Sequence, residues 1–425
     1  MTLLAVTFFV LMLLGMPIAF AIGIAGFSFF LFSGSVPLSI AVQQVATASQ
    51  SFPLLAVPFF VLAGHMMNKS GITARLIDCS NVLVSWMAGG LAQVSIVLST
   101  LMGGVSGSAV ADAAMEARIL GPSLIARGYS RGFTAAVIAV SSLITATIPP
   151  SLGLILYGFV GEVSIGRLFL AGLVPGLLMM AFLMVTVWII AKRRNYRPEM
   201  ARRPNAREVG TALWQAKWAI LFPLALLVAI RGGVFAPSEV GAFAVVYAGL
   251  VGFLAHRELD WAGLRTALKE ALVDTGMIML IILMSGMVGY AIIIEQAPQS
   301  IATAMTTLTQ EPVLIVALIL VFLFVAGLFV ESTVLVLLLT PIFLPIVKQL
   351  HVDPVHFGIL MMTIVTLGSM TPPVGVAMYT VCSLLKTPIE KYVVESLPLI
   401  GAVLLLVVIL TLSPSLVLFL PNLLM

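Results

Sequence analysis

The sequence predicts an all-α, polytopic membrane protein, and three observations carry this prediction. Of the 425 residues, 61% are hydrophobic and only 9% are charged, whereas a soluble domain carries about 25% charged residues. Apolar stretches long enough to cross a bilayer recur over the whole length, with no soluble domain between them. Phe, Leu, Ile and Val follow one another without the strict alternation of an outer-membrane β-barrel, so the spanning segments are predicted to be helices.

The apolar stretches define the predicted helices in chain order. Residues 1–4 lack the basic segment of a signal peptide, so the first stretch is expected to stay as a spanning helix. In the first half, helices are predicted over residues 3–33, 52–65 and 168–191. Between the last two of these lie a predicted hairpin near 90–125 and an interrupted helix near 141–151. In the second half, spanning helices are predicted over residues 218–230 and 397–420, with two further spans that end at 256 and 294. The segment 257–270 is predicted to be amphipathic. A hairpin is predicted near 313–347 and an interrupted helix near 366–375.

Positive charge is concentrated in the loop 191–217, which separates the two halves. This loop holds eight of the 21 Lys and Arg residues but only two acids. Short basic loops stay on the cytoplasmic side of a membrane, so this loop is predicted to be cytoplasmic. A surface patch for anionic lipid is the alternative interpretation. Because the net charge of +4 arises largely here, it gives no indication of nucleic-acid binding.

Four short segments rich in Gly, Ser, Thr and Pro interrupt the apolar pattern. They are residues 106–112, 141–151, 327–333 and 366–375. Inside a bilayer, irregular backbone is tolerated only where protein or a water-lined cavity satisfies its polar groups. The interruptions therefore predict a binding site within the membrane.

The interruptions recur at matching places in the two halves. Pro149-Pro150 and Pro372-Pro373 lie 223 residues apart, and Gly121-Pro122 and Thr340-Pro341 lie 219 apart. We therefore predict a first repeat over 1–190, the basic loop 191–217 and a second repeat over 218–425. An odd number of spans between the repeats would invert one against the other. In secondary transporters, paired interruptions of this kind mark the substrate site.

Interrupted helices offer groups that bind ions. The exposed N–H groups at a new helix start attract anions, whereas freed carbonyls and hydroxyls suit a hard cation such as Na⁺. Four interruptions are enough for about two cation sites with an anion between them. For each hydroxyl, the alternative is a hydrogen bond to its own helix. The candidate hydroxyls are those of Ser106, Ser108, Thr145, Thr147, Ser369 and Thr371.

Three acids accompany the interruptions. Asp112 and Glu116 are four residues apart, so on a helix they share a face and repel each other if both are charged. One of them pairs with Arg118 or another base, or one is protonated. Glu331 lies in the matching interruption of the second half. For these acids a structural ion pair and a role in ion coupling both remain open.

No metal centre or organic cofactor is predicted. Cys79 and Cys382 lack ligand spacing and are interpreted as core thiols. No two histidines have metal-ligand spacing, and most lie near predicted ends of spans: His65, His256, His351 and His356. Na⁺ is expected as the coupling ion, with no transition metal.

Two enzyme interpretations are weak. Gly104-Val-Ser-Gly107 resembles the nucleophile motif of rhomboid intramembrane proteases, but a four-residue match in a glycine-rich chain carries little weight. Such a serine needs a histidine base in a neighbouring span, and only His356 is a candidate. The chain has no Gly-x4-Gly-Lys-[Ser/Thr] loop, so it is not expected to hydrolyse ATP. A transporter is predicted, and an intramembrane serine protease is a distant alternative.

Seven short motifs in order resemble one known family. Over essentially its whole length, the chain resembles the large membrane subunit of tripartite ATP-independent periplasmic (TRAP) transporters. The resemblance departs at Glu331, where aspartate is more usual. The motifs lie at residues 76–78, 89–93, 106–112, 232–241, 340–345, 353–358 and 371–375.

This resemblance implies an elevator-type carrier with two inverted repeats, each containing a re-entrant hairpin and an unwound helix. It implies sodium-driven uptake of an organic acid across the bacterial inner membrane, for example a C4-dicarboxylate, a sialic acid or a sugar acid. A small four-helix membrane subunit and a periplasmic binding protein are the implied partners. A stand-alone ion-coupled anion carrier is the alternative within the transporter class.

The resemblance also implies site residues. The hairpin tips correspond to Ser106–Ser108 and Gly327–Thr333, and the unwound segments to Thr145–Pro150 and Gly368–Pro373. The residues expected to bind sodium are Ser106, Ser108, Thr145, Thr147, Gly327, Ser332, Thr333, Gly368 and Thr371. Those expected to bind the substrate are Ser106, Gly107, Ser108, Asp112, Pro150, Glu331 and Pro373.

Overall fold

The structure is a computed structural model, and each element it describes is helical. It describes residues 2–32, 36–50, 52–200, 202–232, 237–309 and 311–425. Four helices are long and apolar enough to cross a membrane, or six spans if two bent helix pairs are included. The chain is therefore a multi-pass α-helical membrane protein, which confirms the predicted fold class. The motif at 232–241 lies partly outside the described residues.

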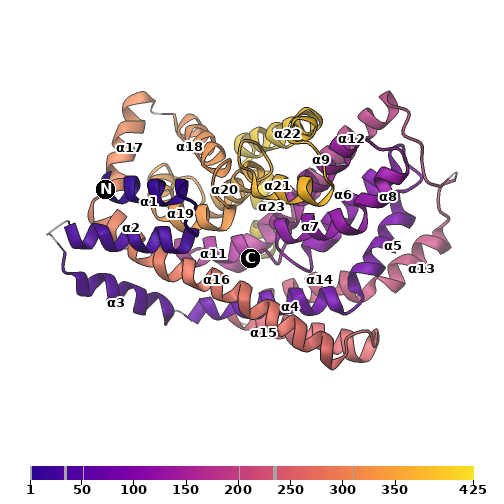
Figure 1. Cartoon of the computed structure of the whole chain (residues 1–425), viewed down its shortest axis with the longest axis horizontal. Helices are drawn as coiled ribbons and strands as arrows, with labels where there is room; N and C mark the ends of the chain where they lie inside the picture. The colour runs from indigo at the N-terminus through magenta and orange to yellow at the C-terminus, as the bar shows by residue number, and fades with distance from the viewer. Residues whose placement is uncertain (1, 33–35, 51, 201, 233–236, 310) are drawn as a thin grey trace.

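One group of helices forms a long side of the molecule, which we call the frame. Within it, α4 packs against α15 and α16, and α16 also packs against α2 and α3. Figure 1 shows α3, α4, α15 and α16 following one another along this side. The frame comprises α1 (Thr2–Leu13), α2 (Ile18–Phe32), α3 (Leu38–Ser49), η1 (Phe52–Leu55), α4 (Ala56–Lys69), α14 (Lys217–Arg231), α15 (Pro237–Leu250), η2 (Val251–Ala255) and α16 (Trp261–Ile294).

After α5 (Ile72–Val84), the first half forms a hairpin and an interrupted helix. The hairpin turns at residues 104–108, where Ser108 Oγ accepts a 3.5 Å hydrogen bond from Ala111 N and so caps α7. The interrupted helix bends by 44° across residues 148–151. These elements are α6 (Gly90–Gly103), α7 (Ala109–Ile119), α8 (Gly121–Ala126), α9 (Arg131–Ser141), α10 (Leu143–Thr147), α11 (Leu152–Gly161) and α12 (Ile165–Arg193).

The second half follows the same order of elements. A hairpin turns at residues 328–331, and an interrupted helix breaks at 369–375. Its elements are α17 (Ala297–Leu308), α18 (Pro312–Gly327), α19 (Ser332–Gln349), α20 (Pro354–Gly368), α21 (Val376–Leu384), α22 (Ile389–Leu412) and α23 (Pro414–Leu424).

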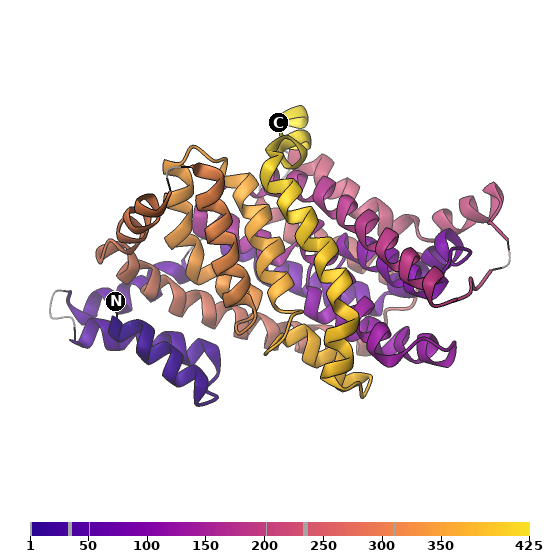
Figure 2. The same cartoon turned by 90° about the horizontal axis from the view of Figure 1, so that it is seen from above.

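The packing between the halves is reciprocal. The helix after the first break, α11, packs against α19, the second arm of the other half's hairpin. Likewise α21, after the second break, packs against α7, and Figure 1 shows these two helices together. Figure 2, turned by 90°, shows α22 crossing one face of the molecule with the C-terminal helix at one end. Reciprocal packing fits two repeats, and their inversion stays a prediction.

Several elements differ from the helices that the sequence predicts. Residues 261–270 are not a separate amphipathic segment but the start of the 34-residue helix α16, because no proline separates them from its apolar part, whereas residues 257–260 precede the helix. The final stretch is two helices, because Pro414 lacks the N–H needed to continue α22. The basic loop contains a further helix, α13 (Ala206–Gln215).

Helix α13 begins with a capping box. Asn205 Oδ1 accepts a hydrogen bond from Glu208 N at 2.8 Å, and Glu208 Oε2 accepts one from Asn205 N at 2.9 Å. Arg202 also donates to the Glu208 carboxylate, and this bond lowers the pKa of Glu208 below its ordinary value. The spacing Asn-x-x-Glu was a local signal for this helix.

Candidate functional site

The tip of the first hairpin lies against the first break. Gly107 has φ +65°, and a Cβ on this residue would overlap the carbonyl oxygen of Pro150. A Cβ on Gly103 would lie 2.8 Å from Ile148 Cβ and 3.4 Å from Thr145 Cα. Glycine is therefore required at 107 by the positive φ and the Pro150 carbonyl, and at 103 by the Ile148 side chain that lies against it.

Asp112 lies beneath this tip, in the first turn of α7. Its side chain is 1% exposed, and its Oδ2 atom has no hydrogen-bond partner. The hydroxyls of Ser106 and Thr145 face the carboxyl group. Thr145 Oγ1 also reaches the first hairpin arm, donating to Ser99 O at 3.1 Å. The tip and the break thus surround a buried carboxylate with oxygen atoms, an arrangement that suits a hard cation.

The backbone of the second hairpin tip contacts the backbone of the second break. A Cβ on Gly368 would lie 2.6 Å from Gly327 Cα, so these two glycines touch. Leu328 O accepts hydrogen bonds from Val374 N at 3.2 Å and from Gly375 N at 3.1 Å. These bonds satisfy groups that the interruption of the helix frees.

Glu331 caps the start of α19. Its carboxylate accepts hydrogen bonds from Thr333 N at 2.8 Å and Val334 N at 3.3 Å. The hydroxyls of Ser332 and Thr333 donate to the same carboxylate at 3.0 and 2.9 Å. A carboxylate at a helix N-terminus interacts favourably with the helix dipole. The structure therefore gives Glu331 a capping role, with no ion pair among the described side chains.

Several predicted ion-binding hydroxyls bond their own segment. Thr147 Oγ1 donates to Leu143 O at 3.3 Å, and Thr371 Oγ1 donates to Leu367 O at 2.8 Å. Ser106 Oγ accepts from Ser108 N at 3.3 Å within the first tip. Of the predicted sodium-binding hydroxyls, Thr145 is the one whose described bond crosses to another helix.

The predicted site residues in the first half of the chain and those in the second half differ in solvent exposure. Pro150 is buried in the first unwound segment, whereas Pro373 in the second is exposed and Thr371 is half-buried. Ser106, Gly107, Asp112, Thr145 and Pro150 lie together at the first tip. Gly327 and Gly368 meet at the second. Among the described residues, no hydrogen bond joins one tip to the other.

The structure adds Tyr392, which the sequence interpretation missed, and the serine partners of Glu116. Tyr392 donates from its hydroxyl to Met370 O, in the second break, at 2.6 Å. Glu116, one turn after Asp112, accepts hydrogen bonds from Ser95 at 2.6 Å and Ser99 at 2.7 Å. The four-residue spacing of these serines on α6 was an available signal, because it places both on one helix face.

The first tip also contacts the frame. A Cβ on Gly64 of α4 would lie 3.7 Å from Ser106 O, and one on Gly104 would lie 2.8 Å from Pro223 Cγ of α14. The tip therefore lies between the first break and two frame helices.

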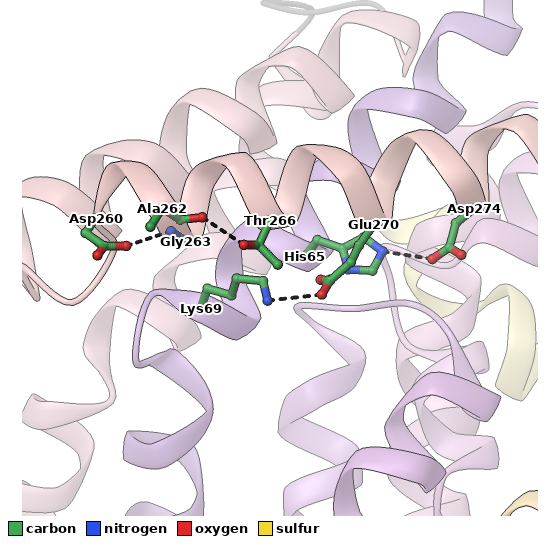
Figure 3. A network of polar contacts seen from close by, with 8 residues as sticks. All are labelled: His65, Lys69, Asp260, Ala262, Gly263, Thr266, Glu270 and Asp274. Atoms are coloured by element: carbon green, nitrogen blue, oxygen red, sulfur yellow. Dashed lines mark hydrogen bonds and ion pairs between the residues drawn. The ribbon is translucent and has the colours of Figure 1, made fainter.

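Behind Gly64, a polar network joins α4 to α16 (Figure 3). His65 Nε2 lies 2.8 Å from Asp274 Oδ2, and His65 Nδ1 lies 3.3 Å from Glu270 Oε2. Lys69 Nζ lies 3.2 Å from Glu270 Oε1. These contacts hold together the two frame helices beside the tip.

The protease alternative finds no support in the site. His356 is buried on α20, where its Nε2 lies 2.9 Å from Leu410 O. None of the described hydrogen bonds joins Ser106 to a histidine. A nucleophilic serine needs a base within hydrogen-bond reach.

The helical hairpins and interrupted helices form a fold that solved structures of other membrane proteins share. The YdaH transporter of Alcanivorax borkumensis has the same fold, with a TM-score of 0.64 and 13% identity over 88% of this chain and 87% of that one. MtrF of Neisseria gonorrhoeae gives a TM-score of 0.60 and 11% identity, over 88% and 83%.

Residues 5–416 match the family described as tripartite ATP-independent periplasmic transporter, DctM component. The chain belongs to this family, which confirms the resemblance read from the motifs. It is 34% identical to the sialic acid large permease SiaM of Vibrio cholerae, over 97% of this chain and 96% of the relative. It is 34% identical to the C4-dicarboxylate large permease DctM of Pseudomonas aeruginosa, over 95% and 94%.

Another relative, the isethionate permease DctMQ of Oleidesulfovibrio alaskensis, is 35% identical over 97% of this chain. The chain spans 65% of that relative's length. All three relatives are named as permease proteins. The chain is therefore a transporter subunit and not an enzyme.

Proposed function

We propose that this chain is the transport subunit for sodium-coupled uptake of an organic acid across the bacterial inner membrane. Relatives named for sialic acid, C4-dicarboxylate and 2,3-diketo-L-gulonate support an organic-acid substrate. In this proposal the chain works with a small four-helix membrane subunit and a periplasmic binding protein that delivers the acid.

The unpartnered Oδ2 atom of buried Asp112 is the observation that carries sodium coupling. An uncompensated charge inside a protein costs several kcal/mol. A sodium ion held by Asp112, Ser106 and Thr145 would offset this cost and would join the hairpin tip to the break. Backbone carbonyls around Gly327 and Gly368 would hold a second ion at the other tip.

The substrate carboxylate is proposed to lie at the start of α7. The N–H groups of a helix start attract an anion, and the side-chain cap described at the start of α7 is the neutral hydroxyl of Ser108 on Ala111 N. Glu331 already occupies the start of α19 with its own carboxylate. The two tips are therefore not equivalent in this mechanism: the first tip binds the acid group and the second closes the site.

Transport is proposed to move the hairpins and interrupted helices past the frame. Gly64 and Pro223 touch the first tip through van der Waals contacts and without a described hydrogen bond. Because no described hydrogen bond has to break at these contacts, the hairpins can slide along the frame at low energetic cost. The contacts of His65 with Asp274 and of Lys69 with Glu270 join α4 to α16 beside the tip that is proposed to move.

The test is uptake into liposomes that hold the chain with its small membrane subunit. An inward sodium gradient is imposed, and a loaded binding protein is added outside. Uptake that needs both the gradient and the binding protein supports the proposal. Uptake that needs sodium alone would identify a stand-alone carrier, and uptake indifferent to sodium would refute the coupling.

A matched pair of variants tests the site. Asp112→Asn is expected to reduce uptake at least tenfold and to raise the sodium concentration for half-maximal rate. Asp78→Asn makes the same change at an exposed position on α5 and is expected to leave both quantities unchanged. Equal behaviour of the two variants would contradict a sodium site at Asp112.

A further inference from the structure

Glu116 is a fully buried acid outside the proposed sodium site. It is 0% exposed and lies on α7 between the first hairpin arm and the interrupted helix. Ser95 Oγ lies 2.6 Å from Oε2, and Ser99 Oγ lies 2.7 Å from Oε1. Ser141 of α9 completes the group, with its Oγ 3.0 Å from Ser99 Oγ and 3.3 Å from Ser95 Oγ. We call these four residues the Glu116 cluster.

No positive side chain compensates Glu116 among the described residues. Of the helices packed against α7, α6, α8 and α10 carry no titratable side chain. Helix α9 carries Arg131 at its exposed start, and α21 carries Tyr379 and Cys382, none of which bonds Glu116. On α7 itself Arg118 is exposed, and Asp112 would add a second negative charge.

Two buried carboxylates one helical turn apart cannot both stay charged without compensation. Each isolated charge costs several kcal/mol in the protein interior, and the two repel each other. A carboxyl group in this position becomes neutral or holds a cation. The packing of the Glu116 cluster decides between these two outcomes.

The packing favours a proton over a metal ion. The carboxylate and hydroxyl oxygens are already in direct hydrogen-bond contact, and Glu116 and its three serines are all buried. A metal ion would have to separate these oxygens and displace the surrounding apolar side chains. A proton bound to the Glu116 carboxylate needs no additional space in this packing.

We propose that the Glu116 cluster is a proton-binding site, and that the hairpins and interrupted helices, which we call the transport body, carry the proton with them. The carboxylate takes one proton from a hydronium ion of the surrounding water: the O–H bond of the acid forms as one O–H bond of hydronium breaks, which leaves a water molecule and a neutral glutamic acid. Oε2–H then donates to Ser95 Oγ, Ser95 donates to Ser141 Oγ, and Ser141 donates to Ile138 O. Ser99 donates to the remaining carbonyl oxygen, Oε1. Every hydrogen of the cluster has an acceptor at distances of 2.6 to 3.3 Å.

This site changes the charge balance of the proposed coupling. With Glu116 neutral, Asp112 is the single negative charge on the buried face of α7, so one sodium ion at the first tip neutralises it. This consequence rests on the proposed function. The protonation of Glu116 does not, because it follows from burial and packing alone.

Infrared spectroscopy of the purified, membrane-reconstituted chain tests the site without any transport assay. The spectrum of Glu116→Gln is subtracted from that of the unaltered chain at neutral pH. A carbonyl stretch of a protonated carboxylic acid in the difference is the expected result. A carboxylate stretch in its place would overturn the proposal.

Uptake gives the second measurement. Glutamine has the shape of a neutral glutamic acid, so Glu116→Gln is expected to keep sodium-driven uptake within about twofold of the unaltered chain. Glu116→Asp keeps a titratable acid but withdraws it from Ser95 and Ser99, so it is expected to lose more uptake than Glu116→Gln. A well-folded Glu116→Gln variant that loses uptake tenfold would overturn a neutral Glu116. If the unaltered chain shows no sodium-driven uptake, the proposed function fails while the infrared result still decides the protonation.

Discussion

Single hydroxyl groups hold the interrupted backbone in place at the residue scale. Tyr392 is fully buried, and its hydroxyl donates to Met370 O in the second break. Interruption of the helix leaves this carbonyl without an intrahelical donor. Tyr157 is buried to the same degree, but its hydroxyl bonds Pro354 O at the start of α20, remote from the breaks.

These two tyrosines provide a matched prediction. Each Tyr→Phe change removes one hydrogen bond and is expected to lower the free energy of unfolding by about 1 kcal/mol. Tyr392→Phe is also expected to raise the sodium concentration for half-maximal uptake several-fold, because the second unwound segment loses a support. Tyr157→Phe should leave that concentration unchanged. Thermal unfolding and uptake against sodium concentration measure the two effects, and equal sodium responses would show that Tyr392 does not position the site.

Glu331 gives a second prediction at this scale. If its role is to cap α19, Glu331→Asp should retain uptake, because aspartate is a favoured N-cap residue. Glu331→Ala should lower the free energy of unfolding by about 1 kcal/mol, the typical cost of losing an N-cap side chain. Thermal unfolding and uptake are measured for both. A large loss of uptake in Glu331→Asp with unchanged stability would indicate a direct role in ion coupling.

The elements show what the amino-acid pattern reveals and what it does not. Runs of Gly, Ser, Thr and Pro in apolar sequence predict interruptions near 106–112 and 366–375. The helices do break there, because the position of a helix break depends on the residues in the break itself. Contacts between distant elements have no such local signal. The approach of Gly327 to Gly368 and the Glu116 cluster depend on how whole helices pack. The prediction of a separate amphipathic segment ahead of the apolar part of α16 is wrong, because a change from polar to apolar residues does not end a helix when no proline or glycine turn interrupts it.

The contact between the first tip and the first break is tested by two glycines with positive φ. Gly107 has φ +65° and lies against the Pro150 carbonyl, whereas Gly128 has φ +89° and open space around it. Alanine at either position costs about 1 to 2 kcal/mol of backbone strain. Gly107→Ala should in addition separate the tip from the break and reduce uptake at least tenfold. Gly128→Ala is the control for strain alone, and a similar loss of uptake in both variants would contradict the tip contact.

At the scale of the whole molecule, the frame meets the transport body at the first tip and also through the packing of α16 against α19. The first tip lies against α4 and α14, while α4 is tied to α16 by the His65 network. In the proposed mechanism this arrangement separates binding from movement, because the side chain of Ser106 faces Asp112 whereas its carbonyl lies beside Gly64 of the frame. A change on the frame can therefore slow transport without altering the ion site.

Gly64 on α4 tests this separation. A leucine there would enter the space occupied by Ser106 backbone, since even a Cβ would lie only 3.7 Å from Ser106 O. Gly64→Leu is expected to lower the maximal uptake rate at least fivefold while the sodium concentration for half-maximal uptake changes less than twofold. Gly276→Leu is the control, because Gly276 lies on the frame helix α16 with open space around it. An equal loss of rate in both variants would assign the effect to the frame's own packing. A shift in sodium dependence with unchanged maximal rate would show that α4 acts on the ion site, and the frame would then take part in binding as well as in movement.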